Sequence, residues 1–251
     1  MKMRIMRALF SILGAAILVI MWALVSWTGL VSPILLPGPS VVLSSAYELL
    51  ASGDLTADLR FTLVQVLTAF GMAALGGTAL GLAMGSFRPV YRATIPLLDF
   101  FRSVPVTSLY PVFVLTLGIG ALSKLAMAFV AAIWVVALNT AYGVRHCSPV
   151  RTQMATMYGA SRRQVFLLVR FFETLPQTAV GLRVALSYVL VVEILAEMFM
   201  GSALGLGQRL TDAYTKYRIA ELYAVILIIG LLGFGANRLF QLVEQRIIHW
   251  K

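Results

Sequence analysis

The sequence RTQMATMYGASRRQ, residues 151–164, is a polar, arginine-bearing segment between two apolar stretches at about residues 122–144 and 175–200. Each apolar stretch is long enough to cross a bilayer as a helix, which takes about 20 mostly apolar residues. A chain this apolar keeps so large a polar segment only if another molecule docks there. The segment therefore predicts a polytopic helical membrane protein that carries a docking loop.

The composition supports a location in the bilayer. Of the 251 residues, 60% are hydrophobic and 12% are charged, and the mean hydropathy is +0.91, which is more apolar than a soluble core of this size requires. The net charge of +10 is spread over loop ends, so it indicates membrane orientation and argues against nucleic acid as a partner. Cys147 is the only cysteine, and His146 and His249 lie far apart, so we expect neither an intrachain disulfide nor a metal site.

Six transmembrane helices are predicted, giving an all-α fold with a single transmembrane domain over residues 1–251. The third span is interrupted by Asp99, Arg102, Pro105 and Pro111, so we expect it to be kinked or broken and to line protein or water. The first span exceeds a signal-peptide core and is interpreted as a retained helix. The predicted spans cover about residues 8–27, 59–87, 95–119, 122–144, 175–200 and 222–242.

The distribution of Lys and Arg predicts the orientation. With the N-terminus inside, 13 of the 20 basic residues, Lys251 among them, lie on the cytosolic side, and five, including Lys124, lie on the other side. This asymmetry favours both termini in the cytosol. The loop at about residues 146–172 is then cytosolic, and the segments at about 29–58 and 201–220 are periplasmic.

Helix signals occur in two of these segments. In the loop, Pro149 can open a helix, Gly159 breaks it, and Ser161 can cap a second short helix that runs to Phe166. Two short helices that meet at a glycine form a compact knob, although an amphipathic hairpin lying on the membrane has the same composition. Before the second span, Ser40 is predicted to cap a short amphipathic helix.

The loop resembles the coupling loop of ATP-binding-cassette (ABC) importer permeases, which reads approximately E-A-A, three residues, G, nine residues, I-x-L-P. Ala155, Gly159 and Val169 fall at the matching spacing, whereas Gln153 replaces the acidic residue and Phe172 stands where proline is usual. Nine further pieces resemble permeases of the nitrate, sulfonate and taurine type, in order along nearly the whole chain. They are residues 36–40, 102–105, 118–120, 138–140, 159–162, 181–183, 196–198, 205–207 and 229–233.

The resemblance implies a type I ABC importer permease in the bacterial inner membrane. Such a subunit pairs with a second copy of itself, two cytosolic ATPase subunits that bind ATP and Mg²⁺, and a periplasmic or lipoprotein solute-binding protein. The implied cargo is a small, anionic solute such as nitrate, bicarbonate, a sulfonate or taurine. The residues implied to contact the ATPase are Gln153, Ala155, Gly159, Ala160, Ser161, Arg162 and Arg163.

Polar residues within the apolar stretches are candidates for a translocation path, because a charge in hydrocarbon costs several kcal/mol unless it is paired or faces water. Glu193 and Glu197 share one helix face and predict either a cation or proton site or ion pairs between helices. Arg102 offers a forked donor to an oxyanion, a salt bridge to Asp99, or an anchor at the membrane interface. The remaining candidates are Arg183 and Asn139, and for Asn139 a hydrogen bond to a neighbouring helix is favoured over lining the path.

The chain carries no G-x-x-x-x-G-K-[S/T] phosphate loop and no nucleophile, histidine and acid arrangement typical of a hydrolase. We therefore predict a transport subunit that is not itself an enzyme. Two alternatives remain at this stage. One is an ion-coupled secondary transporter or channel that uses Glu193, Glu197 and Arg102, and the other is a membrane scaffold that transports nothing.

Overall fold

The computed structural model describes residues 2–250, which are helical apart from their connections, and the predicted all-α fold is confirmed. Lys251, counted above among the inner basic residues, lies outside the described residues. The α-helices are α1 (Lys2–Trp27), α2 (Pro39–Ala51), α3 (Thr56–Ser86), α4 (Arg88–Ser103), α5 (Tyr110–Leu117), α6 (Ala121–Arg145), α7 (Pro149–Met157), α8 (Arg162–Gln164), α9 (Phe171–Met200), α10 (Leu206–Thr215) and α11 (Ile219–Ile247), with a 3-10 helix η1 (Val106–Leu109) and a π-helix η2 (Val165–Arg170).

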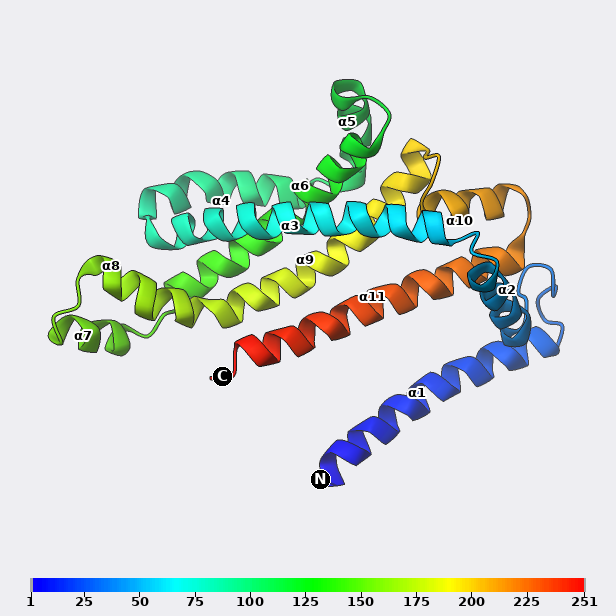
Figure 1. The fold of residues 1–251 in the computed structure, drawn as a ribbon, viewed down its shortest axis with the longest axis horizontal. Helices are drawn as coiled ribbons and strands as arrows, with labels where there is room; N and C mark the ends of the chain where they lie inside the picture. Colours follow the sequence, from blue (N-terminus) through cyan, green and yellow to red (C-terminus); the bar gives the residue numbers. More distant parts are fainter. Residues whose placement is uncertain (1, 251) are drawn as a thin grey trace.

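Helices α3, α6 and α9 form the centre of the bundle, with α6 packed between the other two (Figure 1). Small residues permit this packing. A Cβ atom added to Gly77 of α3 would lie 2.8 Å from the carbonyl oxygen of Ile133, and one added to Gly181 of α9 would lie 2.6 Å from Cβ of Asn139. In lipid, where apolar surface alone does not drive helices together, such close backbone approach supplies the packing energy.

The predicted count of six spans is not confirmed. In the described part of the chain, four helical segments are long and apolar enough to cross a membrane: α3, α6, the continuous segment Arg162–Met200, and α11. A fifth span results if α4 is joined to residues 106–117, across a bend of 91°. The predicted break in the third span is therefore present. Of α1, the stretch Leu13–Trp27 is an apolar helix shorter than a full span in the part of the chain that the structure describes with side chains.

Helix α1 lies at the edge of the bundle and extends away from it (Figure 1). It is held near its C-terminal end, where Trp22 stacks on Tyr223 of α11 at 6.5 Å and donates a hydrogen bond from Nε1 to the Pro37 carbonyl oxygen at 3.1 Å. The predicted cap of α2 is wrong. The helix begins at Pro39 with Gly38 as its N-cap, because proline favours the first helical position, and Ser40 lies inside the first turn.

The polar connections lie at two opposite ends of the bundle (Figure 1). Helices α7 and α8 lie at one end, which we call the α7 end, and α11 runs back toward it. Helices α2 and α10 lie at the other end, which we call the α10 end. The long central helices connect the two ends.

Candidate functional site

The conformation of the predicted docking loop is determined by residues that cap, begin or end its helices. Ser148 caps α7 by accepting a hydrogen bond from the backbone N–H of Arg151, and Pro149 is the first helical residue. Gly159 has φ = +82°, a conformation that side chains disfavour, and it reverses the chain after α7. Ser161 then forms a capping box with Gln164, in which the Ser161 N–H donates to Gln164 Oε1 at 2.8 Å.

The second half of the predicted knob differs from expectation. Helix α8 does not end at Phe166 but continues through the π-helix η2 into α9, so that residues 162–200 form one helical segment of 39 residues. The cause is that no residue between Ser161 and Phe171 terminates a helix, and Pro176 is accommodated within α9. The loop is therefore one short helix joined to the extended end of a central span.

The predicted coupling residues lie on the surface of this loop. Gln153, Gly159, Ser161, Arg162 and Arg163 are exposed, and Ala155 and Ala160 are half-buried. Beside them, the side chains of Met157 and Tyr158 are among the most exposed apolar groups of the chain, at 87% and 88%. An apolar tip flanked by arginines is a composition typical of protein interfaces.

Glu173, which the sequence interpretation did not single out, fixes the loop to α9. Its Oε2 accepts a hydrogen bond from the Ser148 N–H at 2.8 Å, and its Oε1 lies 3.0 Å from Nη1 of Arg151. The Glu173 side chain is only 13% exposed. A lone acid in the first turn of an apolar helix was the available signal, because such a charge requires a nearby partner.

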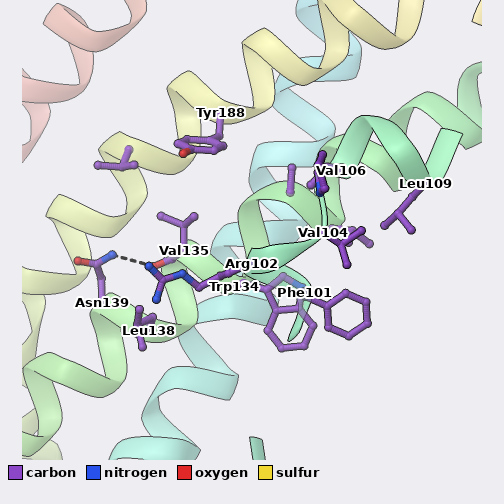
Figure 2. A pocket seen from close by; sticks show the side chains of 14 residues that line it. Phe101, Arg102, Val104, Val106, Leu109, Trp134, Val135, Leu138, Asn139 and Tyr188 are labelled. Atoms are coloured by element: carbon purple, nitrogen blue, oxygen red, sulfur yellow. Dashed lines mark hydrogen bonds between the residues drawn. The ribbon is translucent and has the colours of Figure 1, made fainter. Parts of the chain in front are cut away.

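In the middle of the bundle, Arg102 and Asn139 line one cavity of about 480 Å³ (Figure 2). The cavity lies between the end of α4, the face of α6 and Val184 and Tyr188 of α9. Phe101 and Trp134 stack at 5.2 Å to form part of its wall.

The two polar candidates in this cavity have different partners. Asn139 joins α6 to α9, because its Oδ1 accepts a hydrogen bond from Gln177 Nε2 at 3.1 Å. Its Nδ2 donates to the Val135 carbonyl oxygen at 2.8 Å, the bond drawn in Figure 2. Asn139 thus combines the packing and lining roles considered from the sequence. Within residues 2–250 the guanidinium of Arg102 forms no ion pair, with Asp99 or with any other acid.

The structure separates the other three path candidates from this cavity. Arg183 reaches Glu244 of α11 at 3.8 Å. Glu197 is fully buried at the α10 end, where its Oε1 accepts a hydrogen bond from the Thr62 hydroxyl and its Oε2 accepts one from the Gly207 N–H, both at 2.7 Å. Glu193 is also fully buried, close to Gln65 and Lys124, and in the described part of the chain neither of its carboxyl oxygens has a hydrogen bond of standard geometry.

Glu197 belongs to a network that holds α10 against α3 and α9. The Asp58 carboxylate accepts a hydrogen bond from the Gly205 N–H at 2.8 Å, and the Thr62 hydroxyl accepts one from the Leu206 N–H at 2.9 Å. Acidic and hydroxyl groups thereby satisfy the backbone donors at the start of α10, as a helix N-terminus requires. The position of Glu197 favours a structural role over ion binding.

Comparison with known proteins gives a consistent family assignment. The family model described as "Binding-protein-dependent transport system inner membrane component" matches residues 77–249. A probable ABC transporter permease protein of Brucella abortus is 30% identical over 92% of this chain and 90% of its own length. The taurine transport system permease protein TauC of Escherichia coli is 29% identical, covering 96% and 89%, and the nitrate import permease protein NrtB of Synechocystis is 26% identical, covering 85% and 80%.

Solved structures support the same fold. A chain of the MetNI methionine ABC transporter, in a structure described as inward facing, superposes with a TM-score of 0.65 at 19% identity and covers 78% of this chain and 94% of its own. A chain of an amino acid ABC transporter gives a TM-score of 0.60 at 16% identity, covering 81% and 96%. These likenesses show that the fold is that of a type I ABC importer permease.

Proposed function

Because this chain belongs to the binding-protein-dependent transport inner membrane component family, as an ABC importer permease of the nitrate, sulfonate and taurine type, we propose that it couples ATP hydrolysis by partner subunits to the import of a small anion. Two copies form the path, and each loop 146–172 docks on one cytosolic ATPase, which binds ATP and Mg²⁺. A periplasmic or lipoprotein solute-binding protein delivers the solute at the opposite face. The complex lies in the bacterial inner membrane, with both termini of each permease in the cytosol.

The main observation that supports this proposal is the continuous helix of residues 162–200. One end of the helix lies in the loop, beside the exposed tip formed by Met157 and Tyr158. Farther along, Val184 and Tyr188 line the central cavity. A helix transmits displacement along its axis because its backbone hydrogen bonds resist stretching. Movement of the loop therefore changes the wall of the cavity.

The proposed cycle follows from this connection. ATP binding closes the ATPase pair and draws the two docked loops together. Helix α9 of each copy tilts, since Glu173 holds the loop to α9 and the capping box of Ser161 begins the continuous helix. The central cavity then changes from inward to outward access, and hydrolysis restores the first state. The permease contributes rigidity and an exposed docking surface, and the partner ATPase carries out the chemistry.

Arg102 supports an anionic cargo. It lines the central cavity without an acidic partner among residues 2–250, and a guanidinium is the side chain best suited to hold a carboxylate, sulfonate or nitrate through forked hydrogen bonds. Relatives are named for aliphatic sulfonates, taurine and nitrate, all of which have anionic oxygens. We propose the same class of solute here.

The coupling proposal is tested by Gly159→Pro, with Gly159→Asn as its matched control. Proline is confined to φ near −65° and cannot adopt the observed +82°, whereas asparagine tolerates that region. In proteoliposomes that contain both ATPase subunits and the solute-binding protein, we expect Gly159→Pro to lower ATP-driven uptake by about tenfold. Uptake by the Gly159→Asn variant should remain close to that of the unsubstituted protein.

Assembly and membrane insertion of both variants are checked by size-exclusion chromatography. Full uptake by an assembled Gly159→Pro transporter would overturn the proposed role of the loop. Uptake by the permease alone, driven by an ion gradient, would instead support the ion-coupled alternative that uses Glu193, Glu197 and Arg102. The bonded state of Glu197 already weighs against that alternative, since both of its oxygens are occupied by protein donors.

A further inference from the structure

A second cavity, of about 420 Å³, lies at the α10 end of the bundle and has no role in the coupling cycle described above. One wall is Phe61 of α3. Another is the start of α6, including Ala121 and Lys124, and a third is the connection after α9, residues 200–204. In the proposed orientation this cavity faces the solute-binding protein, and we call it the outer cavity.

Lys124 is the unusual residue of the outer cavity. The sequence places it among the outer basic residues at a loop end, but its side chain is only 2% exposed. In the described part of the chain, its ammonium group makes no hydrogen bond or ion pair. It lies 5.6 Å from the ring centroid of Phe61 and interacts with Glu193 and Glu197 only at longer range. These two carboxylates balance the charge of Lys124 at a distance, but a buried ammonium also needs close hydrogen-bond acceptors, so its donors are available to a bound anion.

The backbone around Lys124 also favours an anion. Ala121 is the first residue of the 25-residue helix α6, and the first N–H groups of a helix lack partners within the helix and carry partial positive charge. The turn is held in place because Gln65 Nε2 donates a hydrogen bond to the Ala121 carbonyl oxygen at 2.8 Å and Ser123 donates to the Gly118 carbonyl oxygen. A fixed helix N-terminus and a buried lysine therefore border the same cavity.

We propose that the outer cavity is a binding site for a small oxyanion of the carboxylate, sulfonate or nitrate class, with Lys124 as its cationic contact. The claim that transported solute binds here first rests on the proposed function. The claim that the cavity binds an anion does not depend on the proposed function. Glu193 and Glu197 weaken the positive field of Lys124, which suits a site that must release its anion inward, since conduction requires binding strong enough to enter and weak enough to leave.

The position of Lys124 on α6 connects the outer cavity to the central one. Ala131 and Val135, seven and eleven residues farther along, lie on the same helix face as Lys124 and line the central cavity with Arg102. At 1.5 Å per residue, Lys124 and Val135 are separated by about 16 Å along the helix axis. A cationic group therefore borders each of two cavities along one face of α6.

Cysteine accessibility tests the site without requiring transport. Ala121 is exposed and borders the outer cavity, so Ala121→Cys, combined with Cys147→Ser, places a single thiol there. The assembled transporter is treated with a negatively charged and a positively charged methanethiosulfonate reagent of similar size. We expect the negative reagent to react faster than the positive one, by about tenfold, because one unit charge a few ångströms away acts on both. Nitrate or methanesulfonate should slow the modification relative to chloride, which is not an oxyanion, at equal ionic strength.

Variants of Lys124 test whether its charge causes the reagent preference and the protection by nitrate. In the Ala121→Cys protein, Lys124→Met should remove the charge preference and the protection by nitrate, and Lys124→Arg should keep both. Lys216→Met, which removes an exposed lysine directly after α10 at the same end, is the matched control and should change neither. Charge preference and protection that persist in Lys124→Met would overturn the proposal. If that variant does not assemble, the absence of nitrate and methanesulfonate protection in the Lys124 protein itself would overturn it.

Uptake assays separate the two proposals. If the thiol shows Lys124-dependent anion protection but the complete transporter imports no anion with ATP, the proposed function fails and the anion site stands. If ATP-driven anion uptake is present but no protection is seen, the site fails and the proposed function stands. If both are present, uptake of nitrate or taurine by Lys124→Met should fall while uptake by Lys216→Met is retained, and equal uptake by the two variants would overturn the entry role.

Discussion

The two ends of the bundle hold their polar groups in opposite ways. At the α10 end, Glu197 and Thr62 are fully buried, and their hydrogen bonds connect α3, α9 and the start of α10. At the α7 end, most of the loop is exposed, and apart from the contacts of Glu173 and Cys147 its side-chain hydrogen bonds join residues three or four positions apart. The α10 end is therefore a buried, cross-linked packing unit, whereas the α7 end presents an exposed surface, which the proposed function assigns to the partner ATPase.

The largest expected effect comes from breaking the buried network at Glu197. Glu197→Ala leaves the Thr62 hydroxyl and the Gly207 N–H without their acceptor in a buried site, and each unpaired donor costs roughly 1–3 kcal/mol. We expect a loss of about 3 kcal/mol in the free energy of unfolding. That loss corresponds to a fall of roughly 6–12 °C in Tm for a chain of this size, measured by thermal unfolding in detergent.

Glu48→Ala is the control for this prediction, because Glu48 is an exposed acid of α2 at the same end of the bundle. Its Tm should stay within about 1 °C of the unsubstituted protein, as expected for an exposed site. Equal Tm values for the Glu197 and Glu48 variants would show that the buried network does not stabilise the α10 end.

A smaller effect on stability, with a larger effect on coupling, is expected at Glu173. Glu173→Ala removes the acceptor of the Ser148 N–H and the partner of Arg151, which is itself 67% exposed. The loss should be about 1 kcal/mol in the free energy of unfolding. Because the start of α7 is then held less firmly to α9, the number of solute molecules imported per ATP hydrolysed should fall roughly fivefold.

Arg151→Ala sharpens this comparison, since it removes only the exposed ion pair and leaves the bond between Glu173 and Ser148. The Arg151→Ala transporter should therefore import nearly as many solute molecules per ATP hydrolysed as the unsubstituted protein. If the Glu173→Ala transporter imported as much solute per ATP as the unsubstituted protein, the contact between Glu173 and Ser148 would not be needed for coupling.

The smallest effect concerns Cys147, at the base of the loop. Burial raises the pKa of the Cys147 thiol, so a smaller fraction is thiolate near neutral pH than for an exposed cysteine. Methanethiosulfonate should therefore modify Cys147 more slowly than a cysteine introduced at the exposed Met157 in a Cys147→Ser background. With rising pH, the rate at Cys147 should still increase after the rate at Met157→Cys has levelled off. Matching pH profiles would contradict the burial of this thiol.

Several features were predictable because they depend on residues close in sequence. The start of α7 at Pro149, the reversal at Gly159 and the cap at Ser161 follow from the backbone preferences of proline, glycine and serine. The break in the third span followed from Pro105 and the charges around it. The family resemblance was carried by short motifs of the same local kind.

Other features were not predictable because local signals compete or because partners lie far apart in the chain. Ser40 offered a cap, but Pro39 set the first helical position and moved the start of α2. The prediction that the second helix of the loop ends at Phe166 was wrong, since nothing after Ser161 interrupts the helix that becomes α9. Six apolar stretches suggested six spans, whereas length and bending leave four or five in the described chain.

From the sequence alone, a helical membrane protein with an exposed polar loop between two spans and an importer-type motif order could be predicted, since apolar runs, prolines and glycines act through hydropathy and local backbone geometry. The tertiary structure alone decided which polar groups act together. Glu197 contacts Thr62, which is 135 residues away, Asn139 meets Gln177, and Lys124 is buried beside Phe61. Charges in a low-dielectric interior are governed by their nearest neighbours in space, and helix packing brings those neighbours from distant parts of the chain.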